Sequence, residues 1–411
     1  MSIFSIIAII FSVSAILGYI NNRWINLPGA IGIMTLSLFL GVALKVAEYF
    51  TPDYIAPFET QLRSFDFGTF LMDITLCFLL FAGSLHVRYN ELKEVKATVI
   101  SYATFGVVAS TVITAFLTKI VFFLFNHEVD WITCLLFGAL ISPTDPIAVM
   151  GIISKFNLPK KLKVEIVGES LFNDGIGVIV FTVIYSVYKA GMESVTVMDV
   201  VKLFSIEVAG GLLIGMLIGY IGYYLIKTID HYQTEVIITL AIVMGGYSFA
   251  NAIHASGPLA MVVAGIFIGN KGKNEAMSDL TADYVDKFWE LVDEICNTLL
   301  FVIMGMQVFL IPFDLSYFLV SIVMIVMVLL SRYLSLLPPF YLLNRGGDRR
   351  MLDLSVLTWG GLRGGISLAL SLSLINHIKH SELFLLITYT IVVFSVIVQG
   401  LTMSKLLKRY Q

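Results

Sequence analysis

Four oxygen-bearing side chains follow one another closely inside a long apolar segment of the sequence. Residues 168–175 read Gly-Glu-Ser-Leu-Phe-Asn-Asp-Gly. In a helix, side chains four residues apart share a face, so Glu169 stacks on Asn173. Ser170 stacks on Asp174 in the same way, and the two pairs form one continuous stripe. Hard cations bind carboxylate and carbonyl oxygens, so the stripe predicts a site for such a cation, with a structural polar network between helices as the alternative.

The composition around this stripe is that of a membrane protein. The 411 residues are 58% hydrophobic and only 13% charged, with a mean hydropathy of +0.90. Soluble domains are about 45 to 50% apolar and about 25% charged. A charge at the centre of a spanning helix costs about 2.5 to 3.5 kcal/mol, so each one needs a reason. Besides Glu169 and Asp174, the deeply placed charges are Asp145, Arg332 and Arg363.

Acids outnumber bases in these apolar segments, so at least one carboxylate lacks a fixed partner. We expect Glu169 to pair with a buried arginine, for which either Arg332 or Arg363 could serve. Asp174 is then the carboxylate left over, and Asp73, a third of the way along its segment, could be another. A carboxylate in poorly solvated surroundings can hold a proton near neutral pH and release it when a cation offers its charge instead. This competition is the mechanism of a cation/proton antiporter, because the two loaded states cross the bilayer more easily than the empty charged one.

Thirteen apolar segments are candidates for spanning helices, of which a bilayer needs about 20 residues each, and the ninth of them is short. Loops that follow even-numbered segments contain few basic residues, which by the positive-inside rule places the N-terminus outside and the C-terminus in the cytoplasm. The predicted segments are approximately 3–20, 28–46, 67–85, 97–125, 131–154, 164–189, 204–227, 234–253, 257–270, 289–311, 315–343, 352–376 and 383–404.

Helix-breaking residues interrupt the fifth and the twelfth of these segments. Residues 142–146 read Ser-Pro-Thr-Asp-Pro, and residues 360–365 read Gly-Gly-Leu-Arg-Gly-Gly. Both breaks come fifth in their half of the chain, which is the pattern of an inverted repeat with a substrate site at mid-membrane. We therefore predict an all-α polytopic membrane protein forming a single unit, with inverted six-helix repeats at approximately 1–190 and 232–411 joined by the linker helix 204–227. The core would contain the fifth, sixth and twelfth helices.

Other classes of protein are disfavoured by the composition. Cys77, Cys134 and Cys296 stand singly in apolar runs, which argues against a disulfide or a thiol-bound metal. The net charge of -3 and the lack of a long basic run argue against nucleic acid. An intramembrane aspartyl protease would need two facing aspartates, for which Asp145 and Asp174 are candidates, but no Gly-x-Gly-Asp run is present. A channel is a further alternative, although an unpaired carboxylate at mid-membrane favours an occluded site.

The two broken segments and the acidic run 169–175 resemble the signatures of the monovalent cation:proton antiporter-1 family. This family includes bacterial and archaeal sodium/proton antiporters and the animal sodium/proton exchangers, and the resemblance covers essentially the whole chain. It implies a homodimer in the cell (inner) membrane that transports Na⁺, or Li⁺ or K⁺, against H⁺ for pH homeostasis and needs no cofactor. A potassium/proton antiporter and another cation-coupled transporter stay open as alternatives.

The resemblance also implies roles for single residues. Asp174 would bind either the cation or the proton, and Glu169, Ser170 and the backbone carbonyl of Thr144 would help to hold the metal. Asp145 would act through water or hydrogen bonds.

Other positions bear on charge balance. Asn173 stands where electrogenic relatives have a second aspartate, which implies an electroneutral exchange of one cation for one proton. Arg332 is similar to the arginine that pairs with Glu169, while Arg363 follows the family pattern without its usual acidic partner, because Phe81 occupies that position.

An acidic segment precedes the tenth span. Residues 275–294 contain seven acids and Lys287 as the basic residue among them. We interpret this segment as a loop, and either a cytoplasmic funnel that concentrates cations or an ordinary solvated surface would explain its charge.

Overall fold

The computed structural model describes residues 3–145, 147–153, 156, 158–191, 194–312, 314–343, 350–375 and 377–410, and within them all regular structure is helical. The first half contains α1 (Ile3–Ile20), α2 (Gly29–Phe50), α3 (Pro52–Ser64), α4 (Phe67–Thr69), α5 (Leu76–Leu85), α6 (Tyr89–Ser101), α7 (Val107–Leu124), α8 (Trp131–Ile141), α9 (Ile147–Ile153) and α10 (Lys160–Ala190). The second half contains α11 (Val197–Lys227), α12 (Tyr232–Ala252), α13 (Gly257–Phe267), α14 (Lys273–Glu275), α15 (Asp279–Leu310), α16 (Leu315–Leu343), α17 (Arg350–Trp359), α18 (Gly365–Ser373), α19 (Ser381–Val393) and α20 (Gly400–Leu407). Wider π-helical turns, η1 (Asn21–Ile25), η2 (Phe70–Thr75), η3 (Tyr102–Gly106), η4 (Ile268–Gly272) and η5 (Phe394–Gln399), extend or join several of them, and the short 3-10 helix η6 (Lys408–Tyr410) follows α20.

Ten helical stretches of the described chain are long and apolar enough to cross a membrane. They correspond to ten of the thirteen predicted segments. The other three, at 131–154, 257–270 and 352–376, are occupied by α8 with α9, by α13 with η4, and by α17 with α18. The all-helical membrane fold is therefore confirmed, while the total of thirteen spans, the inverted repeats and the direction of the termini stay predictions.

The two predicted helix breaks are present. Residues 142–145 separate α8 from α9, and residues 360–364 separate α17 from α18. Pro146, the second proline of the first break, lies outside the described residues. Proline and glycine act here for the expected reasons, since Pro143 cannot donate a backbone hydrogen bond and the glycines lower helix stability.

The acidic segment predicted as a loop is mostly helical, so that interpretation is wrong. Helix α15 begins at Asp279, directly after Ser278, whose side chain accepts a hydrogen bond from the backbone N–H of Thr281. This N-cap and the burial of Val285 and Trp289 on one face fix the helix. The short helix α3, between the second and third predicted spans, was not predicted at all.

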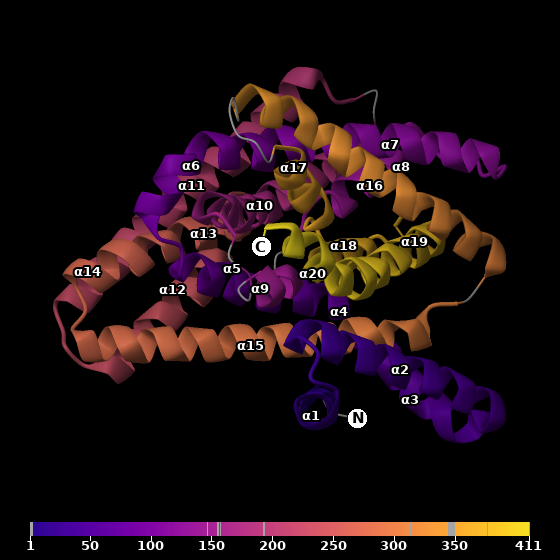
Figure 1. Cartoon of the computed structure of the whole chain (residues 1–411), viewed down its shortest axis with the longest axis horizontal. Helices are drawn as coiled ribbons and strands as arrows, with labels where there is room; N and C mark the ends of the chain where they lie inside the picture. Colours follow the sequence, from indigo (N-terminus) through magenta and orange to yellow (C-terminus); the bar gives the residue numbers. More distant parts are fainter. Residues whose placement is uncertain are drawn as a thin grey trace.

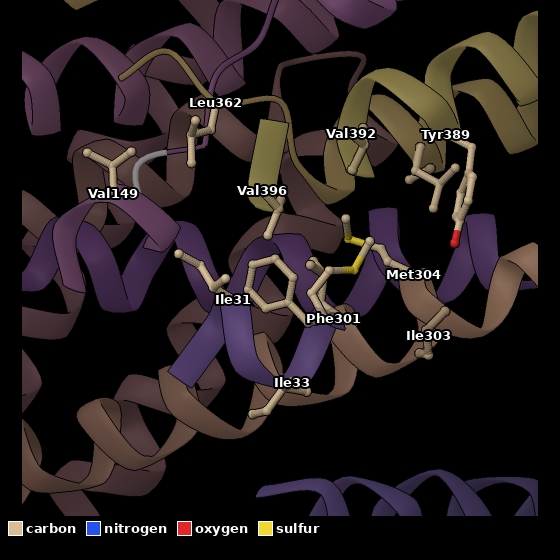
Figure 2. Packing of buried hydrophobic residues seen from close by; sticks show 14 of the residues in the cluster. Ile31, Ile33, Val149, Phe301, Ile303, Met304, Leu362, Tyr389, Val392 and Val396 are labelled. Atoms are coloured by element: carbon tan, nitrogen blue, oxygen red, sulfur yellow. The ribbon is translucent and has the colours of Figure 1, made fainter. Parts of the chain in front are cut away.

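Helix α15 forms a long wall of the molecule. In Figure 1 it runs across the lower part of the view, with α1, α2 and α3 on its far side from the C-terminus. Figure 2 shows that helices remote in the chain share one apolar cluster, in which Ile31 of α2, Phe301 of α15 and Val396 of η5 pack together. All three side chains are almost completely buried.

A close contact between α7 and α8 sets the position of the first break. A Cβ atom added at Gly138 would lie 2.3 Å from the backbone oxygen of Thr111, so the two helices can approach this closely only with glycine there. Ser142, at the end of α8, donates to the carbonyl oxygen of Gly138 at 2.6 Å and lies 3.1 Å from the Thr111 hydroxyl. The close approach of α7 and α8 at Gly138 therefore helps to position Ser142, the first residue of the break.

We expect Gly138→Ala to destabilise the protein by about 1 to 3 kcal/mol, because the added methyl group must push the two helices apart. The measurement is the apparent melting temperature of the purified protein in detergent, which should fall. Gly245→Ala on α12 is the matched control, since a Cβ atom there meets nothing within 4 Å. Equal melting temperatures for the two variants would contradict the assigned close contact.

Candidate functional site

The two helix breaks lie against each other. The backbone N–H of Asp145 donates to the carbonyl oxygen of Leu362 at 2.8 Å, which joins the first break directly to the second. Leu362 itself is completely buried. A non-helical residue of the first break thus forms a backbone hydrogen bond with a non-helical residue of the second. Such pairing is needed because an unpaired backbone group is costly in a low-dielectric interior.

Helix α10 supplies side chains that complete the first break. Asn173 donates from Nδ2 to Thr144 Oγ1 at 2.7 Å, and its Oδ1 accepts from the Thr144 N–H at 3.3 Å. The Ser170 hydroxyl donates to the Thr144 carbonyl oxygen. Thr144 is therefore held at both its N–H and its carbonyl, and its position is set by α10.

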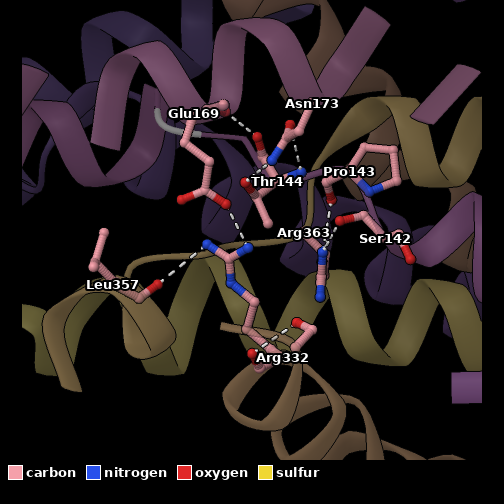
Figure 3. A network of polar contacts seen from close by, with 10 residues as sticks. Ser142, Pro143, Thr144, Glu169, Asn173, Arg332, Leu357 and Arg363 are labelled. Carbon is pink, nitrogen blue, oxygen red and sulfur yellow. Dashed lines mark hydrogen bonds and ion pairs between the residues drawn. The ribbon is translucent and has the colours of Figure 1, made fainter. Parts of the chain in front are cut away.

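Arg363 closes the carbonyl end of α8. Its guanidinium donates to the carbonyl oxygens of Ser142 and of Pro143, the latter at 3.0 Å (Figure 3). The backbone N–H of Arg363 donates to the Ser395 hydroxyl at 3.1 Å. The end of a helix carries unpaired carbonyls and partial negative charge, so a buried cation is stabilised there without an acidic partner. Among the described residues, Asp73 makes no hydrogen bond or ion pair with Arg363.

Arg332 binds a carbonyl oxygen near the C-terminal end of α17 and also pairs with an acidic side chain. Its Nη1 lies 2.5 Å from Glu169 Oε1, and its Nη2 donates to the carbonyl oxygen of Leu357 at 3.3 Å (Figure 3). Both charged side chains are nearly fully buried, with 5% of Arg332 and 2% of Glu169 exposed. The structure thus selects Arg332 from the two arginines that could have faced Glu169.

Glycines in the second break allow charged groups to touch the backbone. A Cβ atom at Gly364 would lie 2.3 Å from a carboxylate oxygen of Asp145. One at Gly361 would lie 2.7 Å from Nε of Arg332. The glycines of this run therefore leave space for the side chains of Asp145 and Arg332, in addition to lowering helix stability.

A cavity of about 390 Å³ reaches the crossing of the breaks from one side. Asp174, Asp145 and Thr144 lie in its wall, and Asp293 and Glu294 of α15 line it as well. Asp174 is 9% exposed, and its Oδ1 has no hydrogen-bond partner among the described residues. A buried carboxylate that faces a cavity with an unsatisfied oxygen can accept a proton or ligate a cation.

The predicted stripe on α10 is divided between two tasks. Asp174 faces the cavity, whereas Glu169, Ser170 and Asn173 hold the arginine and Thr144 and do not line it. Sequence reasoning missed Ser395 and also Gln399, whose Nε2 donates to the carbonyl of Trp359 at 3.1 Å. Two polar residues four apart in an apolar span were the available signal.

We expect removal of either member of the Glu169–Arg332 pair to destabilise the protein more than removal of both. A single change, Glu169→Gln or Arg332→Met, leaves a buried group without its partner and should cost about 3 to 5 kcal/mol, which the double variant partly restores. Melting temperatures of the four proteins measure this coupling. A double variant that loses as much as the two single losses together would show that the pair does not interact.

Comparison with known proteins places this arrangement in a family. Residues 11–409 match the family model described as sodium/hydrogen exchanger, transmembrane. The chain is 42% identical over 409 residues to the Na(+)/H(+) antiporter NhaP of Pseudomonas aeruginosa, covering 98% of this chain and 96% of the relative. It is 32% identical over 386 residues to the Na(+)/H(+) antiporter NhaH of Halobacillus dabanensis, covering 93% and 92%.

A solved structure shares the fold. The sodium proton antiporter MjNhaP1 from Methanocaldococcus jannaschii at pH 8 superposes with a TM-score of 0.69, at 19% identity, over 92% of this chain and 98% of that one. Family model, relatives and fold agree over nearly the full length of the described helices. The chain therefore belongs to the sodium/hydrogen exchanger family of membrane antiporters and is a secondary transporter, not an enzyme.

Proposed function

We propose that the protein exchanges one Na⁺ for one H⁺ by alternating access, with Asp174 binding either ion in turn. The observation that carries this proposal is the state of the Asp174 carboxylate, which is buried, lies in the wall of the cavity and has an oxygen without a partner. Both deeply buried arginines have other partners, Glu169 for Arg332 and backbone carbonyls for Arg363. Among the described residues, neither buried arginine therefore competes with the transported ion for Asp174.

The cation would be held mainly by neutral oxygens around one carboxylate. In the described part of the chain, no three His, Cys, Asp or Glu side chains converge on a metal position. We propose Asp174 and the carbonyl of Thr144, both in the cavity wall, as ligands, with water completing the shell. The hydroxyl of Ser170, which in this structure donates to that carbonyl and does not line the cavity, would join them when the cation binds. Hard monovalent cations suit such a set, and Ser170 would then turn its hydroxyl proton away from the Thr144 carbonyl.

Glu169 and Asp145 would support the site without binding the cation directly. Glu169 would orient α10 through its pairing with Arg332, because its carboxylate already has a partner. Asp145, in the same cavity wall as Asp174, would act through water or hydrogen bonds. Preference among Na⁺, Li⁺ and K⁺, the homodimer and the orientation of the termini stay predictions.

We expect Asp174→Asn to abolish cation/proton exchange, since an amide can neither take up the proton nor offset the charge of the cation. The measurement is the pH change inside inverted vesicles when NaCl is added. Asp73→Asn is the matched control, because Asp73 also sits in a spanning helix but does not line the cavity. Exchange that survives in Asp174→Asn, in protein shown to be folded by size-exclusion chromatography, would rule out this residue as the carrier.

We expect Asn173→Asp to make transport carry charge, because it adds a second carboxylate one residue from the carrier. An aspartate can still accept from the N–H and the hydroxyl of Thr144, so the break should keep its shape. The measurement is the exchange rate in proteoliposomes with and without a potential set by K⁺ and valinomycin. An active variant with a rate as insensitive to the potential as that of the unmodified protein would argue against this control of charge balance.

A further inference from the structure

A second cavity of about 380 Å³ lies between α1, α2 and α15, apart from the one that contains Asp174. Its polar lining consists of oxygen-bearing side chains, among them Ser14, Asn22, Glu294 and Thr298. Lys, Arg and His are missing from its wall over the described residues. The chemistry of this lining is that of a site for a small hard cation.

Ser14 is the unusual member of this wall. Its side chain is 5% exposed, yet its Oγ has no hydrogen-bond partner in the described structure. A serine within a helix ordinarily bonds back to a carbonyl of the preceding turn, as Thr35 of α2 does to Ile31 at 2.7 Å. An unsatisfied hydroxyl is costly in an apolar setting, so a ligand that uses its lone pairs would explain its place.

Glu294 connects this cavity to the ion-binding one, because it lines both. The side chain is exposed, and no hydrogen bond or ion pair to its carboxylate is found among the described residues. A Cβ atom at Gly29 would come within 3.7 Å of its Oε1, so the carboxylate lies against the start of α2. One carboxylate thus contributes negative charge to the walls of both cavities.

We propose that the cavity between α1, α2 and α15 is a side vestibule that binds a monovalent metal cation at Glu294, Ser14 and Thr298 and passes it to the cavity of Asp174. This inference rests on the proposed function, since it assumes that the main cavity takes up the cation. It gives the cation a route to the cavity of Asp174 from the side of α1. Only one of the three proposed ligands, the Glu294 carboxylate, carries a charge. The ion would therefore be bound weakly and could move on to the cavity of Asp174.

Labelling of Gly18→Cys tests binding directly, without measuring transport. Gly18 lines the vestibule, and a Cβ atom there meets nothing within 4 Å. We expect Na⁺ to slow the reaction of this cysteine with a cationic methanethiosulfonate reagent by about threefold relative to N-methylglucamine at equal ionic strength, which is a difference of the size that weak binding produces. The unmodified protein gives the background from its native cysteines.

Additional substitutions decide where the protecting ion sits. Ser14→Ala or Thr298→Val in the Gly18→Cys background should remove the protection, whereas Asp174→Asn should leave it. Protection that persists in both hydroxyl variants, or that is equal for Na⁺ and N-methylglucamine, would overturn the vestibule. Protection that disappears with Asp174→Asn would also overturn it, because the ion would then belong to the main cavity.

Filling the vestibule tests its use in transport. We expect Gly18→Leu to raise the apparent KM for Na⁺ by about threefold while the maximal rate is unchanged, because the site of Asp174 is intact but one route to it is closed. Gly245→Leu, also in open space but on α12, is the matched control and should leave both values unchanged. An unchanged KM for Gly18→Leu would reject the vestibule while leaving the exchange at Asp174 standing, so failure of the two proposals can be distinguished.

Discussion

Two helices that end in the middle of a membrane protein leave backbone groups that water cannot reach, and the architecture of this site follows from that constraint. Each unpaired N–H or carbonyl in an apolar interior costs free energy, so a break survives only where the surrounding chain supplies partners. Here the breaks partly satisfy each other through Asp145 and Leu362. The side chains of α10, α16 and η5 satisfy others through Asn173, Arg332 and Ser395.

The two buried arginines take equivalent positions in this arrangement. Arg363 lies at the carbonyl end of α8, and Arg332 lies at the carbonyl end of α17, so each offsets the partial negative charge of a half-helix. Glu169 balances one of them. Because both arginines are used in this way, neither pairs with Asp174, whose carboxylate lies in the wall of the cavity.

Helix α15 joins the apolar core to the cavity that contains Asp174. One face packs in the apolar core against α2, while Asp293 and Glu294 line the cavity that contains Asp174. Attraction of cations by carboxylates in a cleft of one sign increases their local concentration. A single element therefore serves as wall, packing partner and source of negative charge.

The sequence by itself determined the class of protein, the positions of most spanning helices, the two breaks and the unbalanced charges in lipid, because apolar length, proline and glycine act locally and a charge in a membrane is costly wherever it stands. Residue types and spacing alone left open which arginine faces Glu169, and only the resemblance to the family implied Arg332. They could not determine that Arg363 binds carbonyls, or that Asn173 and Ser170 hold Thr144 while Asp174 faces the cavity. Sequence reasoning also placed in a loop the acidic residues that form the first part of α15, and it passed over Ser14. These outcomes depend on distances between helices remote in the chain, and only close packing in three dimensions decides them.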